Sequence, residues 1–296
     1  MTAPRAASPA SSRAGPVLAL TLNAFTWGVS WWPFRQLEAR GLHALWATAL
    51  IYGLAVAAIT LWRRGAWGDL LRTPSLWGLV LASGTTNAAF NWGITAGDVV
   101  RVVLLFYLMP LWAALLARPL LGERLSRRTV LCVALALLGA GTVLWPAGGG
   151  WPLPQSGPEW LGVLGGFTFA LNNVLLRREA HQPEAARALA MFGGGGLVAA
   201  LLATGLGLQG LVPWPPAPAW GWVLGGLLMG SAFLASNLAL QYGASRLPAG
   251  VTAVVMVTEV VFASASAVLL GAGQLTPALL AGGALIIGAS LLSAQH

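Results

Sequence analysis

The amino-acid sequence predicts an all-α polytopic membrane protein, and three observations carry this prediction. The 296 residues are 57% hydrophobic and only 8% charged, whereas soluble domains carry about 25% charged residues. Ten apolar stretches each approach the roughly 20 residues that a helix needs to cross a bilayer. The gaps between these stretches are short and rich in arginine and turn-forming residues. So few charges could not cover a soluble surface, so lipid is expected to cover much of the chain.

The ten expected transmembrane helices follow one another along the chain, separated by turn-forming residues. The first apolar run extends to Phe34, which is too long for the core of a signal peptide, so it is expected to be a retained helix. No gap is long enough for a soluble domain. In order, the expected spans are 15–34, 42–62, 74–96, 99–117, 126–145, 159–176, 188–207, 219–242, 247–270 and 275–293.

The distribution of arginine predicts the orientation of these spans. All sixteen basic residues are arginines. If the N-terminus is cytoplasmic, thirteen of them fall in cytoplasmic segments, and only Arg35, Arg40 and Arg101 fall outside. Membrane proteins retain basic residues on the cytoplasmic side. We therefore expect an inner-membrane protein with both termini in the cytoplasm, and tryptophans such as Trp160 and Trp214 at the membrane interfaces.

Weak internal similarities divide the chain into two repeats. Thr86-Asn87 matches Ser236-Asn237 at an offset of 150 residues, Phe25-Thr26-Trp27 matches Phe167-Thr168-Phe169 at 142, and Leu121-Gly122 matches Leu270-Gly271 at 149. Each unit contains five spans, so the second unit must enter the membrane from the opposite side. Inverted repeats around a midplane site are typical of secondary transporters. The expected organisation is a cytoplasmic tail (1–14), a first five-helix repeat (15–145), an outer loop (146–158) and a second, inverted repeat (159–293), enclosing a central cavity.

Three local motifs resemble a known transporter family. They are Gly97-Asp98-Val99-Val100-Arg101, Tyr107-Leu108-Met109-Pro110 and Leu121-Gly122-Glu123-Arg124-Leu125, with Thr258-Glu259-Val260 in the second half. The chain is similar to the ten-helix EamA-type drug/metabolite transporters, and among them to aromatic amino-acid exporters of the YddG type. The resemblance implies ten helices and export of small metabolites. The second repeat departs from the pattern, because Ala272-Gly273 replaces the Glu123-Arg124 pair.

Polar residues inside spans are costly and usually face a cavity or another helix. Several recur at helical spacing on one face of spans 1, 3, 6 and 8, and these spans are repeat-related pairs. Hydrogen bonding between helices would explain each residue singly, whereas a shared cavity explains the set. Tyr107 is added as a cavity candidate from span 4. The predicted cavity residues are Asn23, Trp27, Ser30, Ser83, Asn87, Asn91, Tyr107, Thr168, Asn172, Asn237 and Gln241.

The charged candidates lie in spans 4 and 9. Glu259 is the only acid well inside a span. It is either a carboxyl hydrogen-bonded at a helix break near Pro110, or a site for proton coupling or ammonium binding. Asp98 and Arg101 form either a helix cap with a local ion pair, or an outer gate or anchor for a substrate carboxylate. Pro110 is expected to kink span 4 and to act as a hinge.

The pattern favours a secondary transporter that exports small amino-acid-like metabolites, including aromatic and apolar ones, by alternating access. Amides and aromatic rings suit amino, carboxyl and apolar groups, and protons are a candidate coupling ion. The alternative is a broad exporter of drugs or lipophilic cations. Scattered histidines and the single Cys132 predict no metal or other cofactor, and no cluster of His, Asp or Glu suggests an enzyme. The expected partners are a small-molecule substrate and the lipid bilayer, and not nucleic acid.

Overall fold

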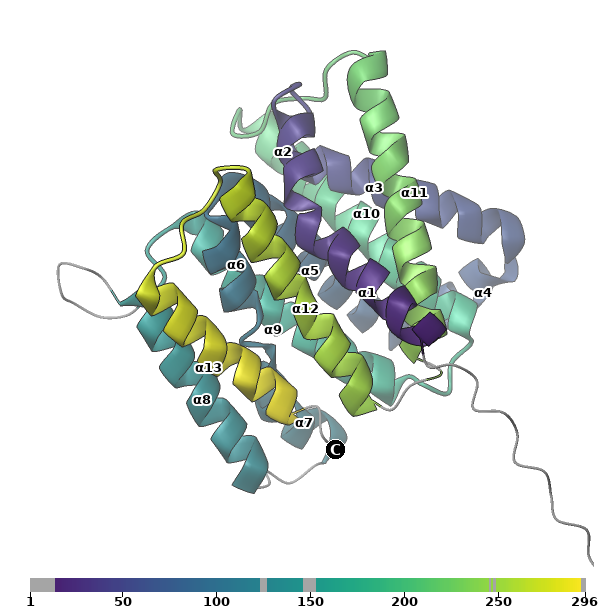
Figure 1. Ribbon diagram of the computed structural model, residues 1–296. Coiled ribbons are helices and arrows are strands. Elements are labelled where there is room, and N and C mark those ends of the chain that lie inside the picture. Colours follow the sequence, from purple (N-terminus) through teal and green to yellow (C-terminus); the bar gives the residue numbers. More distant parts are fainter. Residues whose placement is uncertain (1–13, 123–126, 146–152, 245, 247–248, 294–296) are drawn as a thin grey trace, which may run out of the picture.

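A computed structural model describes residues 14–122, 127–145, 153–244, 246 and 249–293 as a bundle of helices, with no strand in these ranges (Figure 1). The all-α prediction is confirmed. The Glu123-Arg124 pair and most of the predicted tail lie outside the described residues. The helices are α1 (Ala14–Val29), α2 (Trp31–Glu38), α3 (Ala44–Trp62), α4 (Gly65–Arg72), α5 (Leu76–Ala96), α6 (Val99–Phe106), α7 (Met109–Leu121), α8 (Arg127–Leu144), α9 (Gly157–Arg178), α10 (Glu184–Leu208), α11 (Trp220–Ala244), α12 (Ala249–Leu269) and α13 (Pro277–Ser293).

Each of the ten predicted stretches coincides with a helix or a broken helix. Span 1 divides at Ser30 into α1 and α2, and span 4 divides at Tyr107-Leu108 into α6 and α7. A proline follows each break within three residues, namely Pro33 and Pro110. Proline lacks an N–H donor and its ring clashes with the carbonyl four residues earlier, which accounts for both interruptions. The short helix α4 lies in a gap where the sequence analysis expected none.

Judged by length and composition alone, a subset of these helices could cross a membrane. Within the described ranges, α3, α10 and residues Trp220–Leu240 of α11 are long and apolar enough to cross a bilayer. Shorter apolar segments occupy Val99–Ala113, Val130–Val143, Thr258–Leu269 and Pro277–Ala289. In lipid, a helix satisfies its internal backbone hydrogen bonds, so an all-helical fold suits such an apolar chain.

Helices that pack together in one arrangement have counterparts that also pack together when the first half of the chain is matched to the second. Helix α1 packs on α11 and α12, while its counterpart α9 packs on α5 and on α6 and α7. Helix α10 packs on α5, and its counterpart α3 packs on α11. The counterparts α8 and α13 pack on each other at one edge of the bundle, and α3 packs on α10 (Figure 1). This pattern is consistent with the predicted two-fold relation between the repeats.

Glycines allow the closest of these approaches. An added Cβ at Gly162 would lie 2.8 Å from the carbonyl oxygen of Val102, and one at Gly166 would lie 2.4 Å from that of Phe106. Helices α6 and α9 therefore touch through backbone at the Gly-x-x-x-Gly spacing that favours such contacts. Gly122 and Gly271, which the predicted repeat pairs with each other, both have positive φ, at 70° and 68°. Glycine adopts this left-handed conformation readily, so α7 and α12 end in the same way.

Candidate functional site

A cavity of about 250 Å³ lies at the centre of the bundle, and we call it the central cavity. Its walls come from eight helices, α1, α3, α5, α6, α9, α10, α11 and α12. Seven of the predicted residues line it, and six of these come from four helices of the two repeat-related pairs. The seven are Asn23, Trp27, Ser83, Asn87, Asn172, Asn237 and Glu259.

Two asparagines on opposite halves line this cavity, and each has a buried Oδ1 without a hydrogen-bond partner among the described residues. Asn23 is held in place, because its Nδ2 donates to the hydroxyl of Ser236 at 2.7 Å and to the carbonyl of Ser236 at 2.9 Å. Asn172 is only 3% exposed, and its Oδ1 has no hydrogen-bond partner among the described residues. A buried polar atom without a partner is costly. The Asn172 amide is therefore available to a bound molecule.

A third asparagine is locked by its neighbours. Asn87 Nδ2 donates to the carbonyl of Ser83 at 2.8 Å, and the Tyr52 hydroxyl donates to Asn87 Oδ1. Ser83 Oγ in turn donates to the carbonyl of Met191 at 3.0 Å. These bonds connect α3, α5 and α10 on one wall. These bonds fix the side chains of that wall, so the polar groups that form them are used within the protein and are not open to a ligand.

Glu259 supplies the carboxyl group of the cavity. It is 8% exposed, and its Oε2 accepts a hydrogen bond of 3.1 Å from the Tyr107 hydroxyl. Tyr107 stands at the break between α6 and α7, and Pro110 follows three residues later. Gly28 brings α1 against the same turn of α12, since an added Cβ there would lie 2.7 Å from the carbonyl oxygen of Glu259. The carboxyl group thus lies where α1, the α6–α7 break and α12 meet.

Several predicted residues lie outside the cavity lining. Ser30 Oγ donates to the carbonyl of Trp27 at the helix break, and Asn91 Nδ2 donates to Thr48 Oγ1 at 3.0 Å. Thr168 accepts from Thr86 Oγ1 at 2.9 Å, so it joins α9 to α5. For these residues, the structure shows hydrogen bonds within or between helices rather than a place in the cavity lining. Tyr107 does not line the cavity itself, but its hydroxyl contacts two lining residues, the Glu259 carboxyl group and the carbonyl of Met256. The side chain of Gln241 lies outside the described residues.

Most of the aromatic residues that line the cavity were not predicted from the sequence. Spans 2 and 7 were not expected to contribute, yet α3 and α10 line the cavity. Phe90, one turn from Asn87, carried a signal because it shares the polar face of span 3. Phe169 carried another, because the repeat matches it to Trp27. The rings pack on one another, for example Phe90 on Phe106 with centroids 4.7 Å apart. The missed lining residues include Tyr52, Phe90, Phe106, Phe169, Met191 and Phe192.

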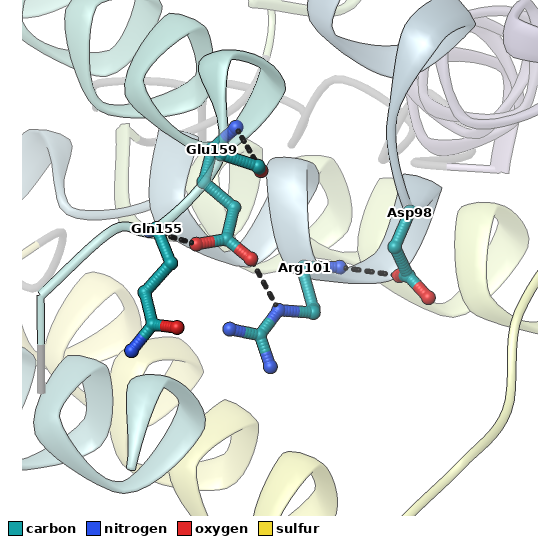
Figure 2. A network of polar contacts seen from close by, with 5 residues as sticks. Asp98, Arg101, Gln155 and Glu159 are labelled. Atoms are coloured by element: carbon teal, nitrogen blue, oxygen red, sulfur yellow. Dashed lines mark hydrogen bonds and ion pairs between the residues drawn. The ribbon is translucent and has the colours of Figure 1, made fainter. Parts of the chain in front are cut away.

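A second cluster of charged residues lies at the start of α6 (Figure 2). Asp98 caps this helix, because its Oδ1 accepts from the backbone N–H of Arg101 at 2.9 Å. Arg101 pairs with Glu159 on α9, Nε to Oε1 at 2.8 Å. The ion pair therefore connects the two halves of the chain, whereas the sequence analysis considered a local pair with Asp98.

Comparison with known proteins finds a family match to part of the chain. Residues 15–145 match the EamA-like transporter family. An uncharacterized transporter of Vibrio cholerae serotype O1 is 28% identical over 133 residues, which cover 42% of this chain and 44% of that protein. Protein RarD of Streptomyces exfoliatus is 25% identical over 162 residues, which cover 51% and 48%. The match thus spans about half the length of these curated relatives.

The same fold occurs in a solved structure. A crystal structure of a protein 22% identical in sequence superposes with a TM-score of 0.57 over 95% of this chain and 96% of that chain. At this identity the likeness concerns the fold alone. The helical arrangement described above is therefore shared along almost the whole chain.

Proposed function

We propose that this chain, whose residues 15–145 match the EamA-like transporter family, is a secondary transporter that exports amino acids and related small metabolites. The family points to transport rather than catalysis. The substrate class that fits the central cavity best is an amino acid with an aromatic or apolar side chain. Alternating access between two repeats would carry it across the membrane.

One observation carries the choice of substrate. The Asn172 amide has an unpartnered Oδ1 in a cavity that also presents the Glu259 carboxyl group. Both oxygens suit an ammonium group, and amide N–H groups suit a carboxylate. The aromatic rings of Phe90, Phe106 and Phe169 supply the apolar wall that an amino-acid side chain needs. No arginine lines this cavity among the described residues, so phosphorylated substrates fit it poorly.

The packing of the helices supports an alternating-access cycle. Among the hydrogen bonds that join the halves next to the cavity are those from Asn23 to Ser236 and from Thr86 to Thr168. Thr86 and Ser236 are equivalent in the proposed repeats, and each contacts the first helix of the other half. Equivalent contacts of this kind allow two related arrangements of similar free energy, which is what a rocking mechanism requires.

The same cavity supports an alternative substrate class. Glu259 faces aromatic side chains, and a carboxylate within aromatic walls also suits lipophilic or quaternary cations. A broad exporter of drugs or cations is therefore our second candidate. In this case the Glu259 carboxylate would pair with the positive charge of the substrate, and the cavity would need no group that binds a substrate carboxylate.

We further propose an inner-membrane location with cytoplasmic termini. The arginine bias of thirteen to three supports this orientation. In Figure 1, α1 begins and α13 ends toward the same side of the bundle. An even number of crossings accounts for that arrangement.

Flux into proteoliposomes tests the proposal directly. Purified protein is reconstituted and offered a panel of radiolabelled amino acids, with and without a proton gradient. We expect flux of aromatic and large apolar amino acids, competed by one another. Transport of quaternary amines without transport of any amino acid would instead select the alternative function.

A further inference from the structure

A second cavity, of about 420 Å³, lies at the start of α6, and we call it the Arg101 cavity. Its lining includes the charged residues Asp98 and Arg101, and the residues Gly273, Gln274 and Thr276 that precede α13. These residues lie on segments predicted to face the outside of the membrane. Its residues are distinct from those of the central cavity. Its volume falls in the range of small-molecule sites, about 300–1,000 Å³.

The guanidinium of Arg101 is held by one hydrogen bond, and its two terminal nitrogens remain available as donors. Its Nε donates to Glu159 Oε1 at 2.8 Å, and Glu159 Oε2 accepts from the backbone N–H of Gln155 at 2.9 Å. Figure 2 shows the two terminal nitrogens of Arg101 pointing away from Glu159. Within the described ranges, no hydrogen bond reaches either nitrogen. A guanidinium held by one edge can offer its other edge to a carboxylate.

Backbone packing explains why this ion pair forms. An added Cβ at Gly97 would lie 2.4 Å from Cβ of Pro158. The absence of a side chain at Gly97 therefore lets the first turn of α9 lie against the start of α6. Glu159, the next residue after Pro158, then reaches Arg101. The position of the guanidinium is set by the contact between the two halves of the chain.

Asp98 presents the opposite charge to the same cavity. Its Oδ1 is used by the helix cap, while its Oδ2 lies 3.9 Å from where a Cβ at Gly273 would stand. That second oxygen has no hydrogen-bond partner among the described residues. The acidic and basic groups therefore line one space, each with hydrogen-bonding capacity left.

The balance of charge selects the class of ligand. Asp98 and Glu159 are acidic and Arg101 is basic, and Arg35 lies next to them. Arg35 is already engaged, since its Nε donates to the carbonyl of Thr95 at 3.1 Å and its Nη2 donates to that of Gly97. Neither sign of charge dominates, so a simple anion or a simple cation would leave one of the lining charges unmatched. A molecule with both charges satisfies Asp98 and Arg101 together.

We propose that the Arg101 cavity is a second binding site for zwitterionic amino acids, at the outer end of the transport route. The ligand carboxylate pairs with the terminal nitrogens of Arg101, and its ammonium group pairs with Asp98 Oδ2. Val143 and Leu279 provide an apolar surface for its side chain. This inference rests on the proposed function for the identity of the ligand.

Protection from chemical labelling tests the site without relying on flux. Cys132 is the only cysteine in the chain, so a Cys132→Ala, Gln274→Cys protein carries one thiol at this cavity. Its reaction with a membrane-impermeant maleimide is timed in right-side-out proteoliposomes, with phenylalanine, 2-phenylethylamine or 3-phenylpropionate present. Occupancy slows labelling by a factor of 1 + [L]/Kd, about tenfold at ten times Kd. We expect phenylalanine to protect, and the two compounds that lack one charge to protect much less.

Variants separate this site from the central cavity. Arg101→Gln should abolish protection, and so should Asp98→Asn, which keeps a side-chain oxygen for the helix cap. Asn172→Ala should reduce flux yet leave protection unchanged. Equal protection by 3-phenylpropionate or by 2-phenylethylamine overturns the zwitterion assignment, and loss of protection in Asn172→Ala overturns a separate site. A protein that transports phenylalanine but shows no protection refutes this inference alone, whereas absence of amino-acid flux refutes the proposed function.

Discussion

The Tyr107 hydroxyl donates a hydrogen bond of 3.1 Å to Glu259 Oε2, joining two residues 152 positions apart. Tyr107 lies at the break between α6 and α7, and Glu259 lies within α12. The bond therefore ties a helix break in the first half of the chain to the carboxyl group in the second half. Movement of one half against the other would change the surroundings of this carboxyl group, and we propose it as the point of coupling between substrate and protons.

Replacement of this carboxyl group tests the proposed coupling. Glu259→Gln keeps the size of the side chain and can still accept from Tyr107, but it cannot titrate. We expect the variant to transport with a rate that no longer follows pH, measured as amino-acid flux in proteoliposomes across a series of pH values. Tyr107→Phe keeps the titratable group and should retain a pH dependence. A Glu259→Gln protein whose flux follows pH as the parent does would reduce the residue to a structural role.

The open amide of Asn172 should contribute directly to substrate binding. Asn172→Ala removes hydrogen bonds to charged groups of the ligand, each worth about 1.5–3 kcal/mol. We therefore expect substrate affinity to fall roughly tenfold or more, measured as the concentration for half-maximal flux. Trp160→Phe serves as the control, because Trp160 is 54% exposed on the surface of α9. Similar flux in the two variants at equal protein amounts would remove Asn172 from the binding site.

Two adjacent glycines in α10 provide a matched test of the packing. A Cβ at Gly194 would lie 2.1 Å from the carbonyl oxygen of Val80, whereas one at Gly193 would meet nothing within 4 Å. Gly194→Ala should therefore lower the free energy of unfolding by about 1–3 kcal/mol through overpacking. Gly193→Ala should leave it unchanged or raise it slightly, because alanine favours the helix. Melting temperatures in detergent measure the difference, and equal values for both variants would contradict the described contact of α10 with α5.

Single cysteines at opposite ends of helices test the orientation. In a Cys132→Ala background, Gln209→Cys follows the end of α10, and Gly65→Cys begins α4. Both positions are exposed. The arginine bias predicts that an impermeant maleimide added to intact cells labels the first and not the second. The reverse pattern would invert the protein in the membrane, and labelling of both would contradict the proposed number of crossings between them.

The aromatic wall of the cavity is a part of the site that could not be predicted in full from the sequence. Asn23, Asn87 and Asn237 could be assigned to a shared face because a polar group in lipid is rare and its helical spacing is visible. Tyr52 and Phe192 carry no such signal, because aromatic residues are as common against lipid as in a cavity. Asn91 and Thr168 carried the same signal as the lining residues, but they pair with Thr48 and Thr86 instead. Periodicity identifies a face of a helix and not the partner that the face meets.

The sequence by itself determined that the chain is helical and apolar, and where the ten expected spans begin and end to within a few residues, although not the break at Ser30 or the short helix α4. It did so because lipid cannot hydrogen-bond to the backbone, and this requirement acts on each apolar stretch separately. Only the tertiary structure decided that Arg101 pairs with Glu159, 58 residues away, and that α3 and α10 close the central cavity. These outcomes depend on which helices touch and at which register. Small residues such as Gly97 and Gly166 set that register by allowing close contacts, and the sequence does not show which atoms they contact.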